Sequence, residues 1–320
     1  MWIAGGWLLL SLIPRPLLAD VVTLKNGREI EGLIVDMDEE RLTLRRAAEG
    51  ITQSWQLTRS EITSIRLAPP DVAGFRSVAK RFEADRSPDE ACEAWRRVCV
   101  LRPEGAPDQV CLVQSYRRRG RLDDASAAAA SAARVHPKDH RIMLEQGEVA
   151  LAMGRAGDAV VLARNHLQLT GPASEAGAWL LARGLEQSRQ VQEALDVYRG
   201  LLRDQPRRND ALERYTDLAL EEGKADEAAQ QAEKVARAAP DLRAGWIALG
   251  KVRYRQSRYP EAVAAFQSAT RLGGPDYDRA RIFLQCALAR RYDRDPRAVL
   301  TTGDLEIAPQ LDPELRRDSP

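Results

Sequence analysis

The sequence predicts a mainly α-helical protein, in which six stacked helical hairpins form an α-solenoid behind a small all-β module. Three features recur in step every 34 or 35 residues. The first is an alanine suited to close helix packing: Ala91, Ala125, Ala159, Ala194, Ala228 and Ala262. The second is the end of each second helix: Pro103, Pro137, Gly171–Pro172, Pro206, Pro240 and Gly274–Pro275. The third is the turn inside each hairpin: Arg86, Gly120, Gly154, Arg189, Gly223 and Ser257.

Composition supports helices and argues against a polyanionic partner. The chain has 320 residues, of which 44% are hydrophobic and 30% charged, as is typical of a globular protein. Aromatic residues make up only 5%, while alanine is abundant, which favours closely packed helices over a large sandwich of strands. The formal net charge is +1, so no global field draws the protein to nucleic acid or to an anionic membrane.

The N-terminus has the features of an export signal. Residues 2–13 (WIAGGWLLLSLI) are almost wholly apolar, but a membrane-spanning helix needs about 20 such residues. Their length suits the core of a signal peptide that ends at Ala19. We therefore expect residues 1–19 to be removed and the protein to be exported, to the periplasm or cell envelope if bacterial, with no transmembrane span after cleavage. A short uncleaved anchor and a misassigned start codon are the alternatives.

Residues 20–70 predict a small β-rich module. Two alternating runs flank Asn26-Gly27, a dipeptide that favours a tight hairpin turn. Three more short runs follow (RLTLRR, ITQSWQLT and ITSIRL), so we expect five strands in a small barrel. The segment resembles the first motif of Sm-like and SH3-like barrels. The matching residues are Val22, Leu24, Gly27, Ile30, Gly32, Ile34 and Asp36.

The module departs from the Sm-like pattern where RNA would be bound. Glu39 and Glu40 replace the Met-Asn pair that holds a base in Sm proteins. Residues 20–70 carry nine acidic and seven basic side chains, whereas RNA binding rests on cationic side chains and stacking platforms. Trp55 is the one candidate platform, and a place in the barrel core is its alternative. Docking or self-association is the expected role.

The repeats resemble the tetratricopeptide repeat, most fully in the last hairpin. The residues that carry this resemblance are Trp246, Leu249, Gly250, Tyr259, Ala262, Phe266 and Ala269. It implies six repeats: 72–105, 106–139, 140–174, 175–208, 209–242 and 243–276. We expect residues 277–292 to form a capping helix and residues 293–320, rich in Pro, Asp and Arg, to form a loose tail.

No pattern of residues indicates catalysis, a metal or a cofactor. His136 and His140 flank a predicted loop and His166 lies near a helix end, so solvent-exposed histidines are expected. The sequence lacks a phosphate-binding loop, a nucleophile elbow and an HExxH motif. Cys92, Cys99, Cys111 and Cys286 are expected as small core residues, with a Cys99–Cys111 disulfide as the alternative.

The resemblance places a partner-binding groove on the first helix of each hairpin. The groove side chains it implies are Arg76, Lys80, Gln114, Arg117, Arg118, Glu145, Glu148, Trp179, Arg183, Glu213, Asp217, Lys251, Tyr254 and Arg255. The first two repeats then supply a basic patch (Arg76, Lys80, Arg117, Arg118) and the fifth an acidic patch (Glu213, Asp217, Glu221). Trp179 beside Arg183 is the expected hot spot. Its alternative is packing against the neighbouring repeat.

These observations predict a non-catalytic scaffold or adaptor of the cell envelope, which holds a segment of another protein in the groove. Nucleic-acid binding by the β module, helped by Arg117–Arg119, is a second hypothesis. A homo-oligomeric assembly factor organised by the β module is a third.

Overall fold

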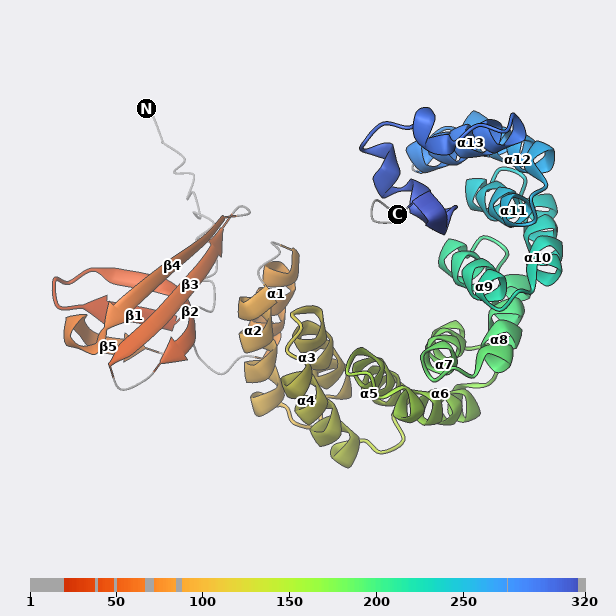
Figure 1. The fold of residues 1–320 in the computed structure, drawn as a ribbon. Helices are drawn as coiled ribbons and strands as arrows, with labels where there is room; N and C mark the ends of the chain where they lie inside the picture. Colours follow the sequence, from red (N-terminus) through yellow and green to blue (C-terminus); the bar gives the residue numbers. More distant parts are fainter. Residues whose placement is uncertain are drawn as a thin grey trace, which may run out of the picture. The chain divides into compact units, whose positions relative to one another are not determined.

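The structure is a computed structural model that describes residues 20–37, 40–48, 51–66, 72–84, 88–274 and 276–315 (Figure 1). The chain divides into two compact units, residues 1–153 and 154–320. A five-stranded sheet and the helices α1 to α5 belong to the first unit, and α6 to α13 belong to the second. A small sheet followed by a helical-repeat array is the fold class that the sequence predicts, and it is confirmed.

The sheet is antiparallel, with strand order β4-β3-β2-β1-β5. Its strands are β1 (Asp20–Leu24), β2 (Glu29–Met37), β3 (Arg41–Ala48), β4 (Ile51–Thr58) and β5 (Ile62–Arg66). Gly27, with a φ of 80°, makes the turn between β1 and β2, as its Asn-Gly dipeptide predicts. Among the described strands β4 and β5 lie at opposite ends of the order, so the predicted closed barrel is not confirmed.

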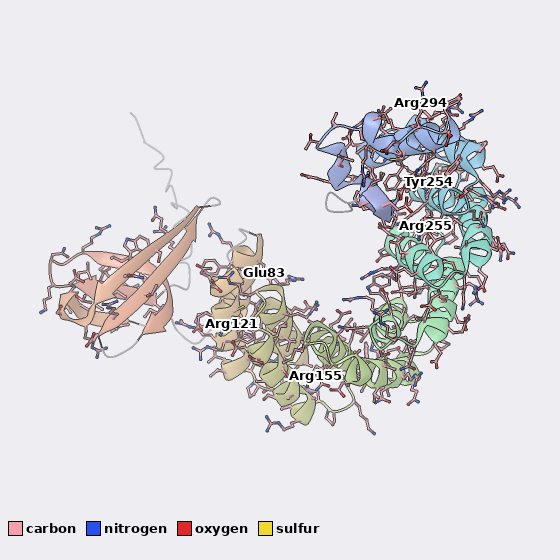
Figure 2. The ribbon with its side chains drawn as sticks, viewed as in Figure 1. Glu83, Arg121, Arg155, Tyr254, Arg255 and Arg294 are labelled. Atoms are coloured by element: carbon pink, nitrogen blue, oxygen red, sulfur yellow. The ribbon has the colours of Figure 1, made fainter. Side chains whose placement is uncertain are left out.

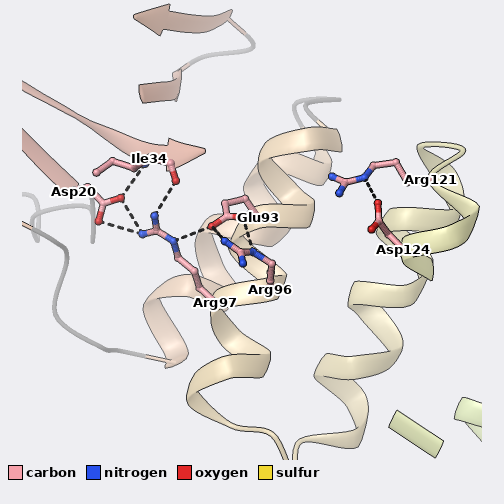
Figure 3. A network of polar contacts seen from close by, with 7 residues as sticks. All are labelled: Asp20, Ile34, Glu93, Arg96, Arg97, Arg121 and Asp124. Atoms are coloured by element: carbon pink, nitrogen blue, oxygen red, sulfur yellow. Dashed lines mark hydrogen bonds and ion pairs between the residues drawn. The ribbon is translucent and has the colours of Figure 1, made fainter. Parts of the chain in front are cut away.

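The sheet has a small apolar core of its own, and polar contacts join it to the first hairpin. Val22, Leu42 and Leu44 are buried there, and Trp55 packs against them while remaining partly exposed. Arg97 donates hydrogen bonds to the carboxylate of the buried Asp20 (2.8 and 3.1 Å) and to the backbone carbonyl of Ile34 (2.8 Å; Figure 3). An ion pair with an additional backbone hydrogen bond therefore joins β1 and β2 to α2.

The helices follow one another at the predicted spacing. In the first unit they are α1 (Val72–Ala84), α2 (Pro88–Leu101), α3 (Ala106–Arg118), α4 (Leu122–Val135) and α5 (His140–Ala152). In the second they are α6 (Ala156–Thr170), α7 (Glu175–Gln187), α8 (Val191–Asp204), α9 (Asn209–Glu221), α10 (Ala225–Ala238), α11 (Arg243–Arg255), α12 (Tyr259–Arg271) and α13 (Tyr277–Arg291).

Small and large side chains alternate where the helices pack. All six periodic alanines are buried, with exposed fractions of 1% or less, because a larger side chain would hold the paired helices apart. Trp95, Tyr198 and Phe266 are likewise buried at the position that an aromatic residue can fill in the second helix. Consecutive helices within each unit form continuous apolar cores through these contacts.

The turns inside the hairpins have left-handed backbone conformations. The φ angle is 77° at Gly120 and Gly154 and 72° at Gly223, where glycine meets no steric penalty. Arg189 (62°) and Ser257 (60°) adopt the same conformation at the equivalent places despite carrying a Cβ atom. The period therefore fixes the backbone shape even where the residue type departs from glycine.

Residues 293–315 are not the loose tail that the sequence predicts. After α13 the chain forms four short 3₁₀ helices: Pro296–Ala298, Asp304–Glu306, Ala308–Gln310 and Pro313–Leu315. Ala308, Leu311 and Leu315 are buried in the core of the last hairpin. Burial of these apolar side chains orders a segment whose overall composition is polar.

Some predictions concern residues that lie outside the described ranges. These are the signal peptide at residues 1–19, Glu39, the turn residue Arg86, Pro275 and the last residues, 316–320. Within the described ranges, none of the helices combines the length and the apolar character that crossing a membrane requires.

Candidate functional site

The first helices of the first unit carry ion pairs within the predicted basic patch. Arg76 of α1 donates to the buried carboxylate of Asp108 in α3, with its Nε 2.6 Å from Oδ1. This hydrogen bond raises the pKa of the Arg76 guanidinium. Arg117 of α3 lies 3.4 Å from Glu145 and 3.7 Å from Glu148, both in α5. Two of the four side chains of the predicted basic patch are therefore paired with carboxylates, which lie on the next first helix.

Gln114, Glu145 and Glu148 belong to the same surface. The Gln114 amide donates to Glu145 over 2.7 Å, and Glu145 is only 5% exposed. Lys80 and Arg118 are exposed on α1 and α3. Arg119 pairs with Asp89 at 2.7 Å. Arg117 and Arg119, two of the three arginines expected to help the β module bind nucleic acid, are therefore paired with carboxylates and offer less uncompensated charge to phosphate.

In the second unit, the first helices of the hairpins also form a surface, which we call the unit-2 first-helix face. It consists of the predicted groove residues on α7, α9 and α11: Trp179, Arg183, Glu213, Asp217, Lys251, Tyr254 and Arg255. These helices lie along one side of the unit, with α8, α10 and α12 along the other (Figure 1). This arrangement puts the side chains of successive repeats next to one another.

The predicted acidic patch on α9 is also compensated. Lys251 of α11 donates to Asp217, and Arg279 of α13 donates to Glu213. Lys251 is only 7% exposed. Its ammonium group is therefore largely shielded from water, and the carboxylate of Asp217 compensates its charge. Glu221, the third member of the patch, is exposed.

A small cavity lies between these helices. Its volume is about 60 Å³, and its lining includes Glu213, Asp217 and Lys251 together with the apolar Leu212 and Ile247. The structure thus brings three predicted groove residues from α9 and α11 to one hollow. A hollow with an apolar floor and charges of both signs suits a peptide side chain better than a polyanion.

Trp179 is half-buried in a cluster of cations and aromatic rings. The Arg208 guanidinium lies 4.4 Å from the centre of the indole, and Arg183 lies 6.0 Å from it. The Tyr198 ring meets the indole edge-on, with 5.8 Å between centroids. Arg208 begins the next hairpin, so packing against the neighbouring repeat accounts for part of the tryptophan surface. The indole remains partly exposed beside Arg183.

Tyr254 and Arg255 come from the end of α11, and Figure 2 shows both side chains there. Arg255 is exposed. Tyr254 is only 5% exposed, because its hydroxyl donates to Asp312 over 2.8 Å and its ring packs in the last core. Of the predicted groove side chains, Tyr254 is therefore the one that the chain's own C-terminal segment covers.

The histidines and cysteines do not gather into a site in the described part of the chain. His166 is 2% exposed and lies 2.9 Å from the hydroxyl of Ser174, so the prediction of an exposed histidine is wrong at this position. All four cysteines are free thiols in the structure, and the alternative Cys99–Cys111 disulfide is not formed. In the part of the chain that the structure describes, no three His, Cys, Asp or Glu side chains converge as a metal site would require.

Sequence reasoning missed two features. One is a hollow of about 510 Å³ between α6, α7 and α8, floored by Leu167, Ala178, Leu181, Val197 and Leu201. Its sequence signal is the small residues Ala178 and Gly200, which leave space between the helices. The other is the packed C-terminal segment, whose sequence signal is a set of apolar residues three or four positions apart within a polar stretch.

Comparison with known proteins identifies the class. The tetratricopeptide-repeat family matches residues 112–170, 180–243 and 247–307, more than half of the sequence, so the chain belongs to that family. The third match extends through α13 into the C-terminal segment. No curated protein sequence matches the chain.

The chain is similar to several solved structures at low sequence identity. The C-terminal part of a TPR repeat-containing protein from Cytophaga hutchinsonii is 14% identical, with a TM-score of 0.55 over 75% of this chain and 95% of that one. MamA from Desulfovibrio magneticus is 14% identical, with a TM-score of 0.47 over 52% and 93% of the two chains. YrrB, a TPR protein with an unusual peptide-binding site, is 17% identical, with a TM-score of 0.46 over 63% and 100%.

Proposed function

We propose that the protein is a non-catalytic scaffold of the cell envelope, whose unit-2 first-helix face holds a segment of another protein. Solenoid repeats bind partners along the extended surface that their stacked helices create. The observation that carries the proposal is the hollow between α9 and α11, where Glu213, Asp217 and Lys251 surround an apolar floor. The apolar run at residues 2–13 supports the cell-envelope location.

The charges on this face favour a protein over a nucleic acid. At the hollow, Lys251 of the face and Arg279 of the neighbouring α13 are held by Asp217 and Glu213, so these two cations offer little uncompensated charge to phosphate. A polypeptide can instead exchange its own side chains and backbone groups with such a mixed surface. The half-buried Trp179 adds an aromatic anchor of the kind that dominates protein interfaces.

Affinity purification from the native cells tests the proposal. The wild-type chain and the double variant Trp179→Ala/Arg183→Ala would be compared by mass spectrometry, with and without nuclease. We expect a nuclease-resistant protein partner that the variant loses at least about tenfold, as removal of a hot-spot pair predicts. Arg203→Ala is the matched control, because this residue is exposed on α8, away from the proposed face. Unchanged recovery by the folded double variant, or recovery that nuclease abolishes, would contradict the proposal.

We also propose that the β module serves docking or self-association. The end strands β4 and β5 supply edges that can pair with another strand. Light scattering of the full chain and of the variant Gln53→Lys/Gln56→Lys, which adds charge to β4 without removing a backbone donor, tests this role. Loss of an oligomer in the variant supports it, whereas a wild-type monomer counts against self-association.

A further inference from the structure

The C-terminal segment stands where a seventh hairpin would have its second helix. α13 begins 34 residues after α11, which is the repeat period. It ends in the turn of the other hairpins: Asp293 has a φ of 52°, and the amide of Arg294 donates to the carbonyl of Ala289. The chain then continues in short 3₁₀ turns instead of a second helix. α13 is therefore the first helix of an incomplete repeat, which leaves its surface to be covered by other means.

Residues 304–315, which we call the C-terminal strap, cover that surface with specific polar contacts. Asp312 accepts from Tyr254 of α11 (2.8 Å) and from Arg290 of α13 (3.0 Å). Asp304 accepts from Arg281 of α13 over 2.8 Å. Each of the two buried aspartates is thus matched to an arginine on the repeat that it covers.

Apolar side chains anchor the strap between these ion pairs. Ala308, Leu311 and Leu315 have exposed fractions of 0%, 0% and 2%. They join the core that contains Ile247 and Phe283, on α11 and α13. Figure 1 shows the strap, in dark blue, beside α11 and α13 on the side of the first helices. It therefore covers the C-terminal end of the unit-2 first-helix face.

The chemistry of the strap is that of a peptide ligand. Its sequence, DLEIAPQLDPEL, contains four acidic residues and no basic one. Its two prolines keep it from forming a continuous helix, so side chains rather than helix packing hold it in place. The receiving surface offers the complementary groups: two arginines, a tyrosine hydroxyl and an apolar pocket.

We propose that the C-terminal strap is a tethered ligand, which occupies a peptide site formed by Tyr254, Arg281 and Arg290. Vacated, this site takes an acidic, leucine-containing segment of a partner protein. The inference rests on the proposed function, because it assigns a chemistry to the partner at one end of the same face. Tethering weakens binding of an outside segment, because its apparent affinity is the affinity for the vacant site multiplied by the fraction of time for which the strap is released.

A fluorescent synthetic peptide with the sequence of residues 303–315 provides the probe. Binding is measured by anisotropy to the full wild-type chain and to the full-length variant Leu311→Ala/Leu315→Ala, whose strap has lost its buried leucines. We expect the variant to bind the peptide at least about tenfold more tightly than the wild type. Adding Arg290→Glu and Arg281→Glu to the variant should remove that gain, and a scrambled peptide should not bind.

Two controls keep the test decisive. Circular dichroism checks that the variant is folded, and Asp312→Asn, which keeps both leucines, replaces it if folding fails. A folded, strap-loosened variant that binds no better than the wild type overturns the proposal and makes the strap a structural cap. A strap-mediated dimer of the variant in light scattering would also overturn it, by making a second copy the occupant. Because the assay uses no natural partner, a negative result leaves the proposed function to its own test.

Discussion

Tyr254 and Asp312 lie 58 positions apart in the sequence and are joined by a buried hydrogen bond of 2.8 Å. Burial raises the pKa of the Tyr254 phenol, and the hydrogen bond to Asp312 raises it further, although Arg290 opposes the shift. The phenol therefore stays protonated at neutral pH and remains a donor. Through this contact, a side chain expected on an open groove is covered by the C-terminal strap.

Acidification should loosen the strap through Asp304. The backbone amide and hydroxyl of Thr301, followed by Arg281, hold the pKa of this carboxyl below its ordinary value. A lowered folded-state pKa means that the stabilisation is complete above the unfolded value, roughly 3.9, and is lost as the pH falls through the folded value. The difference in unfolding free energy between wild type and Asp304→Asn should therefore be constant from pH 7 to 5 and shrink below about pH 4. A difference independent of pH down to 2 would contradict this account.

Gly250 should tolerate no side chain. A Cβ atom at this position would meet the ring of the buried Phe266 at 2.5 Å. Gly250→Ala should therefore lower the free energy of unfolding by about 1–3 kcal/mol, which is the usual cost of overpacking. Gly200→Ala on α8 is the matched control, because nothing lies within 4 Å of its Cβ position. The control should be neutral or stabilising by up to about 1 kcal/mol in urea denaturation. Equal effects of the two substitutions would show that α11 and α12 do not pack as closely at Gly250 and Phe266 as described.

Ser257→Gly should stabilise the protein. Ser257 holds a φ of 60°, in the conformation that Gly223 adopts at the equivalent turn. The left-handed conformation destabilises a residue that has a Cβ atom by roughly 1 kcal/mol, and glycine avoids this cost. Glycine also raises the conformational entropy of the unfolded chain, which offsets only part of that gain in stability. The thermal midpoint should rise for Ser257→Gly and fall for the reciprocal Gly223→Ala. A fall in both variants would mean that the serine side chain, rather than the backbone, decides the stability of its turn.

The native thiols should react slowly. Burial raises the pKa of Cys92 to about 11 and that of Cys99 and Cys286 to about 12, and it also raises the pKa of Cys111. Because the thiolate is the nucleophile, a disulfide reagent at pH 8 should modify the folded protein at least about a hundredfold more slowly than free cysteine. After denaturation all four thiols should titrate. Recovery of only two would instead reveal the Cys99–Cys111 disulfide.

The fold could be predicted from sequence because its information is local and repeated. Each hairpin needs a small residue at the helix contact, and a buried alanine from Ala91 to Ala262 meets that need at every period. The Asn26-Gly27 turn is similarly encoded in two adjacent residues. Closure of the sheet into a barrel could not be predicted in this way, because it depends on whether the end strands β4 and β5 pair with each other.

The candidate site could be predicted only in outline. Repeat position places Asp217 and Lys251 on first helices, but their pairing depends on how far one helix is offset from the next. Their separation of 34 residues, one repeat period, marks them as equivalent positions on neighbouring helices, but packing decides whether their charged groups meet. The sequence does not predict the burial of Leu311 and Leu315 for a related reason. A polar, proline-containing composition indicates a loose tail, and only the folded repeats provide the surface that buries its few apolar residues.

Photo-crosslinking from the unit-2 first-helix face tests the central claim most directly. A photoreactive amino acid at position 255, which is exposed at the end of α11, would be compared in the native cells with one at position 230, exposed on α10. The account predicts a defined, nuclease-resistant protein adduct from position 255 and none from position 230. Adducts from position 230 alone, or nucleic acid at position 255, would contradict the claim that this face holds a protein segment.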